Sequence, residues 1–251
     1  MKTTSFKSAT LCVSTYVLYA FVYYVYRIPV SQWGLAYHDD GETLYHVLSI
    51  LSGRIPYRDD FNHHFPGYIY QFVLTAKAFG FSLKLVDQTA ILTQAGVGLG
   101  CFLCTRLLVG NLAGIAMGLA VVSARQPWVL GFQVQYQLNL LYVFALYFTL
   151  AALERRTQLN FLACCLLLGL TFWFDQRALF LSFLAICSGI ILLRSDAINR
   201  QTLGLGLLIY LSPWILYAIY LYANSALTPF WEQTIVSVSY THLRAHETVS
   251  D

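Results

Sequence analysis

The chain has 251 residues, of which 58% are hydrophobic and only 11% are charged. A soluble domain is usually about 45–50% apolar and about 25% charged, so this composition excludes an ordinary soluble globular protein. The net charge of +3 is small and gives no reason to expect a nucleic-acid partner. The apolar residues form repeated runs of roughly 15–23 residues, long enough to cross about 30 Å of hydrocarbon. These features predict an all-α, polytopic integral membrane protein.

The first apolar run covers residues 10–30 and follows Lys2 and Lys7. It is longer than the apolar core of a signal peptide and has no small-residue cleavage site, so we expect it to remain as a membrane span. The positive-inside rule then places the N-terminus in the cytoplasm. The loop at residues 31–66 is therefore expected to be extracytoplasmic.

The later runs predict six more spans, and the basic clusters between them indicate their direction. ERR at 154–156 and RSDAINR at 194–200 are expected to be cytoplasmic. The short aromatic segment 67–81 is predicted to be an interfacial helix rather than a span. This gives about seven spans, with the first loop, FDQR at 174–177 and Trp231 on the extracytoplasmic side. The six further runs are 86–105, 107–124, 138–153, 160–174, 178–193 and 202–223.

The last residues, 238–251, differ from the rest of the chain. In HLRAHE, His242 and His246 would share one helix face at i, i+4 with Glu247 beside them, which is a spacing typical of metal ligands. However, VSYTHLRAHET closely resembles translated sequencing-adapter read-through, so we expect this tail to be non-native and reject a metal site there. Residues 1–237 are taken as the native transmembrane region, and we expect the natural protein to continue beyond it.

The first loop concentrates most of the polar groups that suggest chemistry. Carboxylates packed as closely as Asp39, Asp40 and Glu42 repel one another, unless a cation, a proton or a substrate uses them. Leu44, Val47, Leu48 and Leu51 recur at helical spacing after this acidic cluster, and Gly53 is expected to end that helix. A second polar cluster then precedes a turn at Pro66–Gly67. It consists of Tyr57, Arg58, Asp59, Asp60, Asn62, His63 and His64.

The loop resembles the GT-C class of membrane glycosyltransferases, in particular the users of dolichyl- or undecaprenyl-phosphate sugars related to protein O-mannosyltransferases and lipid A aminoarabinose transferases. Those proteins have an acidic residue or pair just after the first span, followed by a pattern close to G-x-x-P-Y-x-D-F and then H-x-P-G. GLTFWFDQRALFL resembles a later family segment, with Arg177 near its basic position. The matching loop residues are Asp39, Asp40, Glu42, Gly53, Pro56, Tyr57, Asp59 or Asp60, Phe61, His64, Pro66 and Gly67.

The resemblance implies transfer of a sugar from a lipid phosphate to an acceptor hydroxyl. One of Asp39 or Asp40, with Asp40 slightly preferred, would be the general base beside Glu42. Arg177, Arg58 and Arg125 are candidates for the leaving phosphate. The implied partners are membrane lipid, the polyprenyl-phosphate donor as co-substrate, and a glycan, lipid or protein acceptor, with no cofactor. The remaining candidate substrate-binding residues are Tyr57, Asp59, Asp60, His63 and His64.

Each assignment has an alternative. An acidic cluster also suits a divalent cation, although the likeness to lipid-monophosphate users favours no metal. Arg58, Asp59 and Asp60 also fit a solvated turn, and Asp175 with Arg177 fits a local ion pair at the membrane surface. For the whole protein the alternatives are a lipid-linked oligosaccharide polymerase or ligase, a transporter, and a non-catalytic scaffold. Transport is disfavoured because the runs 86–105, 138–153 and 202–223 contain few or no charges at their centres.

Overall fold

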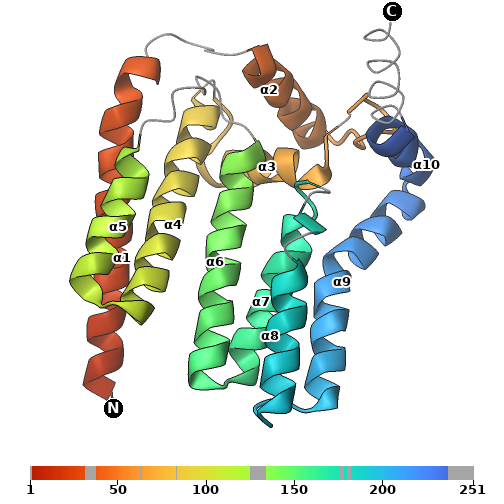
Figure 1. Ribbon diagram of the computed structural model, residues 1–251. Coiled ribbons are helices and arrows are strands. Elements are labelled where there is room, and N and C mark those ends of the chain that lie inside the picture. The colour runs from red at the N-terminus through yellow and green to blue at the C-terminus, as the bar shows by residue number, and fades with distance from the viewer. Residues whose placement is uncertain are drawn as a thin grey trace, which may run out of the picture.

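The computed structural model describes residues 2–31, 38–62, 64–82, 84–124, 134–175, 178–179 and 182–236. These residues fold as helices, and the described part of the chain contains no β-strand (Figure 1). The fold class expected from composition is therefore confirmed at the level of an all-helical protein. The elements are α1 (Lys2–Ser31), α2 (His38–Leu51), α3 (Pro66–Phe79), α4 (Leu85–Leu108), α5 (Asn111–Ser123), α6 (Val134–Arg155), α7 (Gln158–Thr171), α8 (Ser182–Arg194), α9 (Arg200–Ala223), α10 (Leu227–Trp231) and the π-helical turn η2 (Glu232–Val236).

Within the described residues, three helices are long and apolar enough to cross a membrane, namely α4, α6 and α9. The helices α5, α7 and α8 are equally apolar but have only 13 or 14 residues. At 1.5 Å per residue they extend about 20 Å, which is less than the roughly 30 Å of a hydrocarbon core. Every apolar run predicted from the sequence corresponds to a helix, while a count of seven spans stays a prediction.

The bundle is built around α4 and α7. The helix α4 packs against α1, α5 and α6, and α7 packs against α6, α8 and α9 (Figure 1). Tyr19 of α1, Phe102 of α4 and Val122 of α5 are buried in one cluster. Phe161 of α7 and Leu192 of α8 are buried in another. The protein therefore has two helix groups joined through α6.

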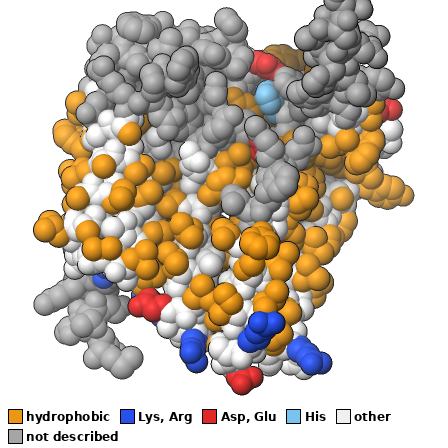
Figure 2. All heavy atoms as spheres, in the orientation of Figure 1, with side chains coloured by type: hydrophobic (Ala, Val, Ile, Leu, Met, Phe, Trp, Pro, Cys, Tyr) orange, Lys and Arg blue, Asp and Glu red, His pale blue; other side chains and the backbone are white. Residues whose placement is uncertain are grey.

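The connections expected on one side of the membrane lie at one end of the bundle. The α4–α5, α6–α7 and α8–α9 turns lie at the lower end in Figure 1, where the N-terminus also lies. Most of the Lys and Arg side chains visible in Figure 2 gather there. The α4–α5 turn is at Gly110, whose φ is 121°. Arg106 therefore belongs to the last turn of α4 rather than to the connection where the sequence predicted it.

The opposite end of the bundle is covered by α2 and α3 (Figure 1). The helix α2 ends at Leu51, two residues before Gly53, the predicted stop. Gly53 has a φ of 89° and lies in a Schellman-type cap: its N–H donates to the Ile50 carbonyl, and the Arg54 N–H donates to the Ser49 carbonyl. Val47 of α2 packs with Phe72 of α3 and Leu85 of α4 in a buried cluster. The segment predicted to be interfacial is thus a helix packed between α2 and α4.

Candidate functional site

The acidic cluster lies within the first turns of α2 rather than ahead of the helix as the sequence suggested. Asp39 and Asp40 are the second and third residues of α2, and their side chains lie outside the described part of the structure. Glu42 is exposed, and its Oε1 is 3.5 Å from Nε2 of His46, one turn further along. The His46 side chain is only 7% exposed. His46 was not among the predicted site residues, although its i, i+4 spacing from Glu42 was a usable signal.

Among the side chains of α2 that the structure describes, three polar ones are buried, namely those of Thr43, His46 and Ser49. Their spacing of three residues brings them close to one face of the helix, and we call them the polar stripe. The hydroxyls of Thr43 and Tyr68 are 2.9 Å apart, which joins the stripe to α3. Burying a polar group without a hydrogen bond costs free energy. The packing of this face of α2 therefore depends on the hydrogen-bond partners of the polar stripe rather than on hydrophobic contacts alone.

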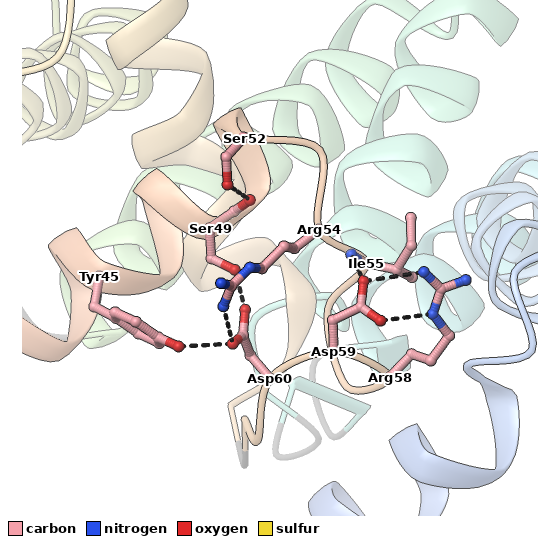
Figure 3. A network of polar contacts seen from close by, with 8 residues as sticks. All are labelled: Tyr45, Ser49, Ser52, Arg54, Ile55, Arg58, Asp59 and Asp60. Carbon is pink, nitrogen blue, oxygen red and sulfur yellow. Dashed lines mark hydrogen bonds and ion pairs between the residues drawn. The ribbon is translucent and has the colours of Figure 1, made fainter.

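Asp60 is held at the end of the polar stripe by three donors (Figure 3). The Tyr45 hydroxyl donates to Oδ1 at 2.7 Å, and Arg54 Nη1 donates to the same oxygen at 3.1 Å. The Ser49 hydroxyl donates to Oδ2. The Asp60 side chain is 8% exposed, which rules out a simple solvated turn for this residue. Its carboxylate fastens the loop to α2.

Asp59 faces away from Asp60 and pairs with Arg58 (Figure 3). Arg58 donates from Nε to Oδ1 at 2.8 Å and from Nη2 to Oδ2 at 3.0 Å, and the Ile55 N–H adds a bond of 2.7 Å. The guanidinium first, and then the Ile55 N–H, lower the pKa of Asp59 to about 2. A carboxylate with so low a pKa is a poor general base at neutral pH. A substrate phosphate would have to compete with the Asp59 carboxylate for the Arg58 guanidinium.

Tyr57 lies inside the loop rather than on its surface. It is 2% exposed, has a φ of 68°, and donates from its hydroxyl to the His64 carbonyl at 2.8 Å. Burial raises the pKa of the Tyr57 phenol, so the hydroxyl stays protonated. Its ring meets Phe230 of α10 edge-on at 5.0 Å. In this structure Tyr57 shapes the loop, and a direct role in substrate binding stays a prediction.

The C-terminal turn η2 holds the same loop through Gln233. Its Oε1 accepts from the Asn62 N–H and its Nε2 donates to the Tyr57 carbonyl, each at 2.8 Å. We call this pair of bonds the Gln233 clip. Arg58 adds a bond of 3.3 Å to the Asn224 carbonyl at the end of α9. Sequence reasoning missed Gln233, because the segment around it carries no motif.

The FDQR segment approaches the loop from α7. The Gly67 N–H donates to the Trp173 carbonyl at 2.9 Å, and Asp175 is buried with 8% exposure. Arg177, His63 and Arg125 lie outside the described residues, as does the tail at 238–251. His64 is half-buried, with its ring centroid 5.0 Å from that of Tyr68. The structure thus brings Trp173 to the end of the predicted loop.

A cavity of about 300 Å³ lies beside the loop between α9 and α10. Phe65 of the loop forms one wall, and the lining is almost entirely aromatic and aliphatic. Such a space suits an apolar group next to the polar end of the bundle. The other lining residues are Phe172, Trp214, Tyr217, Ala218, Leu221, Leu227, Phe230, Trp231 and Ile235.

The predicted base lies at the start of α2, whereas Asp60, one of the predicted binding residues, is bound near the other end of this helix. Asp40 and Ser49 are nine residues apart, which corresponds to about 14 Å along the helix axis. Asp60 is bound at the Ser49 end. Among the described side chains, no group of three or more His, Cys, Asp or Glu residues is arranged to hold a metal ion. Asp39, Asp40 and His63 are not part of that set.

We expect Asp60→Asn to lower the free energy of unfolding by about 1.5–3 kcal/mol, because hydrogen bonds to a buried charged group are worth that much. Thermal unfolding of the detergent-solubilised protein can be followed with a dye that reacts with the buried thiols of Cys104, Cys164 and Cys165. The neighbouring Asp59→Asn variant is the matched control and should lose less, since the Asp59 side chain is 29% exposed and that of Asp60 only 8%. Equal losses in both variants would contradict the structural role of Asp60.

Because the pKa of Asp59 is lowered, the effect of Asp59→Asn on the free energy of unfolding should depend on pH. Because Arg58 lowers the pKa in the folded state, the stabilising contribution is present above the unfolded pKa of about 3.9 and is lost as pH falls through about 2. Unfolding of wild type and of Asp59→Asn should therefore differ at neutral pH and converge in acid.

Comparisons with models of protein families, with curated proteins and with solved structures give no match.

Proposed function

We propose that the chain is a membrane glycosyltransferase. Its donor is a sugar carried on a polyprenyl phosphate, and its acceptor is a hydroxyl group on the extracytoplasmic side of the membrane. The acceptor oxygen attacks the anomeric carbon from the face opposite the phosphate, so the configuration inverts. The C–O bond to the phosphate breaks, the lipid phosphate leaves with the bonding electrons, and a carboxylate takes the acceptor proton.

The observation that carries this proposal is the distribution of polar groups over an apolar bundle. The acidic start of α2 and the loop that carries the motif lie at one end, and the basic turns lie at the other (Figures 1 and 2). The phosphate of such a donor is charged and its prenyl chain is apolar. The reaction is therefore expected at the membrane surface, where the apolar bundle ends. The aromatic cavity beside Phe65 offers space for the apolar part of such a donor.

The contacts divide the roles among the candidate residues. Asp59 and Asp60 are engaged with Arg58 and with Ser49, so they support the loop. The proposed proton acceptor is one of Asp39 or Asp40 in the first turn of α2, and Glu42 follows it in the same helix. Arg177 is the proposed phosphate ligand.

The test uses membranes that contain the full-length protein. Undecaprenyl-phosphate carrying a ¹⁴C-labelled hexose is supplied, and label in all products separated from the unreacted donor is counted. We expect the label to leave the lipid donor only when the protein is present. A nucleotide-activated hexose, supplied while synthesis of the lipid donor is blocked, should give no transfer. Transfer from the nucleotide sugar alone, or none from a series of labelled lipid-phosphate sugars, would contradict the proposal.

A further inference from the structure

A groove of about 520 Å³ is lined by residues of α7, α8 and the first half of α9, and by none of the loop residues. Residues of α7 form its floor, and residues of α8 and α9 form its two walls. Its walls include Ile186, Ile190 and Leu207, which are 57%, 44% and 59% exposed. The other lining residues are Phe161, Cys165, Ser182, Ala185, Arg200, Leu203, Gly204, Gly206 and Tyr210.

The two ends of the groove are polar, and its middle is apolar. Arg200 lies at the end with the basic turns, while Ser182 and Tyr210 share a hydrogen bond of 2.6 Å at the other. Arg200 and Tyr210 are ten residues apart on α9, which is about 15 Å along the helix axis. This is half of the roughly 30 Å hydrocarbon core, so the groove has the length of one membrane leaflet.

The charge at the lower end favours an anion. Arg200 begins α9, where the helix dipole places partial positive charge, and the preceding residue Asn199 caps the helix by accepting from the Thr202 N–H at 2.8 Å. Arg194 at the end of α8 is exposed beside the same turn. Asp196 is the carboxylate in this turn, so two guanidinium groups outnumber one acid.

We propose that this groove binds one acyl chain of an anionic phospholipid, whose phosphate lies at Arg200. The chain lies along the apolar walls and ends near the Ser182–Tyr210 pair, and the headgroup stays at the basic end of the bundle. The inference requires the bundle to stand in a bilayer, and it is independent of sugar transfer.

Gly204 lines the groove, so a substitution there tests whether the groove is occupied by lipid. A Cβ built on Gly204 meets no atom within 4 Å, so a larger side chain there enters open space. Gly204→Phe should fill the groove without a steric clash inside the protein. Leu208→Phe is the matched control, because Leu208 is 63% exposed on the same helix and does not line the groove.

The experiment reconstitutes the full-length protein in phosphatidylcholine vesicles that contain phosphatidylglycerol with a photoactivatable diazirine on its acyl chain. After irradiation, the labelled peptides are mapped by mass spectrometry. We expect adducts on the segment 182–210, reduced roughly tenfold by Gly204→Phe, which displaces at least two methylene groups of the chain. Leu208→Phe should label as wild type does.

The headgroup is tested separately with Arg200→Gln. Loss of this charge should reduce the preference for phosphatidylglycerol over a phosphatidylcholine carrying the same diazirine chain by about fivefold. Equal labelling of Gly204→Phe and Leu208→Phe would show only general contact with lipid and would overturn the proposal. So would a wild-type protein that labels equally with both headgroups. Thermal unfolding of each variant checks that the fold is intact.

Discussion

Asp40→Asn should lower the rate of sugar transfer by about 10²–10⁴-fold, the usual contribution of a general base. Asparagine is close to aspartate in size, so the variant removes the proton acceptor while keeping the shape of the side chain. Asp39→Asn should have the smaller effect of the two if Asp40 is the base. The rate of transfer from the labelled lipid donor is measured as a function of pH. The acidic limb of the profile, where the base becomes protonated, should disappear in the variant that removes it.

The control for this comparison is a carboxylate at the opposite end of the bundle. Asp196 is exposed in the turn between α8 and α9, and Asp196→Asn should transfer sugar at the wild-type rate. Each variant must also retain the thermal unfolding of wild type. Full activity in both Asp39→Asn and Asp40→Asn would remove the acidic cluster from the mechanism and favour a scaffold or a transporter.

Gly169→Leu should destabilise the protein by about 3 kcal/mol or more, because α7 and α9 approach one another backbone to backbone at this position. A Cβ on Gly169 would lie 3.0 Å from the carbonyl carbon of Tyr210 and closer still to its oxygen. Backbone atoms cannot rotate away as a side chain can, so the two helices must separate. The expected result is early exposure of the buried thiol of Cys165 on heating, or failure to accumulate in the membrane.

Gly204→Leu is the matched control for this prediction. It introduces the same side chain into the apolar helix α9, at a place with open space around it. Leucine also has a higher helix propensity than glycine, by roughly 0.6–1 kcal/mol, so this variant should be at least as stable as wild type. Equal destabilisation by the two substitutions would contradict the close packing of α7 on α9.

The apolar runs predict the helices well because a buried or membrane-facing helix needs little beyond continuous hydrophobicity. The end of α7 shows the limit of this reasoning. The run was expected to continue to residue 174, but the helix ends at Thr171. Trp173 instead offers its carbonyl to Gly67, and Phe172 lines the aromatic cavity. Aromatic residues prolong an apolar run whether they belong to a helix or to a packed turn, so hydropathy alone cannot separate the two.

The candidate site was predicted as a set of loop residues, but not as a set of contacts. The turn at Gly53 has a local cause and was predicted correctly. The partners of Asp60 come from α2 and from Arg54, and those of Tyr57 include Gln233, which is 176 residues away in the chain. Such pairings depend on tertiary packing and leave no periodic pattern. For the same reason, sequence alone assigned Asp59 and Asp60 to substrate binding and did not predict that Arg58 and Ser49 bind their carboxylates.

The Gln233 clip also constrains the order of events during synthesis. Asn62 leaves the ribosome 171 residues before the glutamine that accepts its N–H. At ~5–20 residues per second, this delay is roughly 10–35 s. During that interval the loop lacks its partner on η2 and its contact with the end of α9. The loop therefore reaches its final form late, after the last described helices have been synthesised, and its folding is coupled to completion of the bundle.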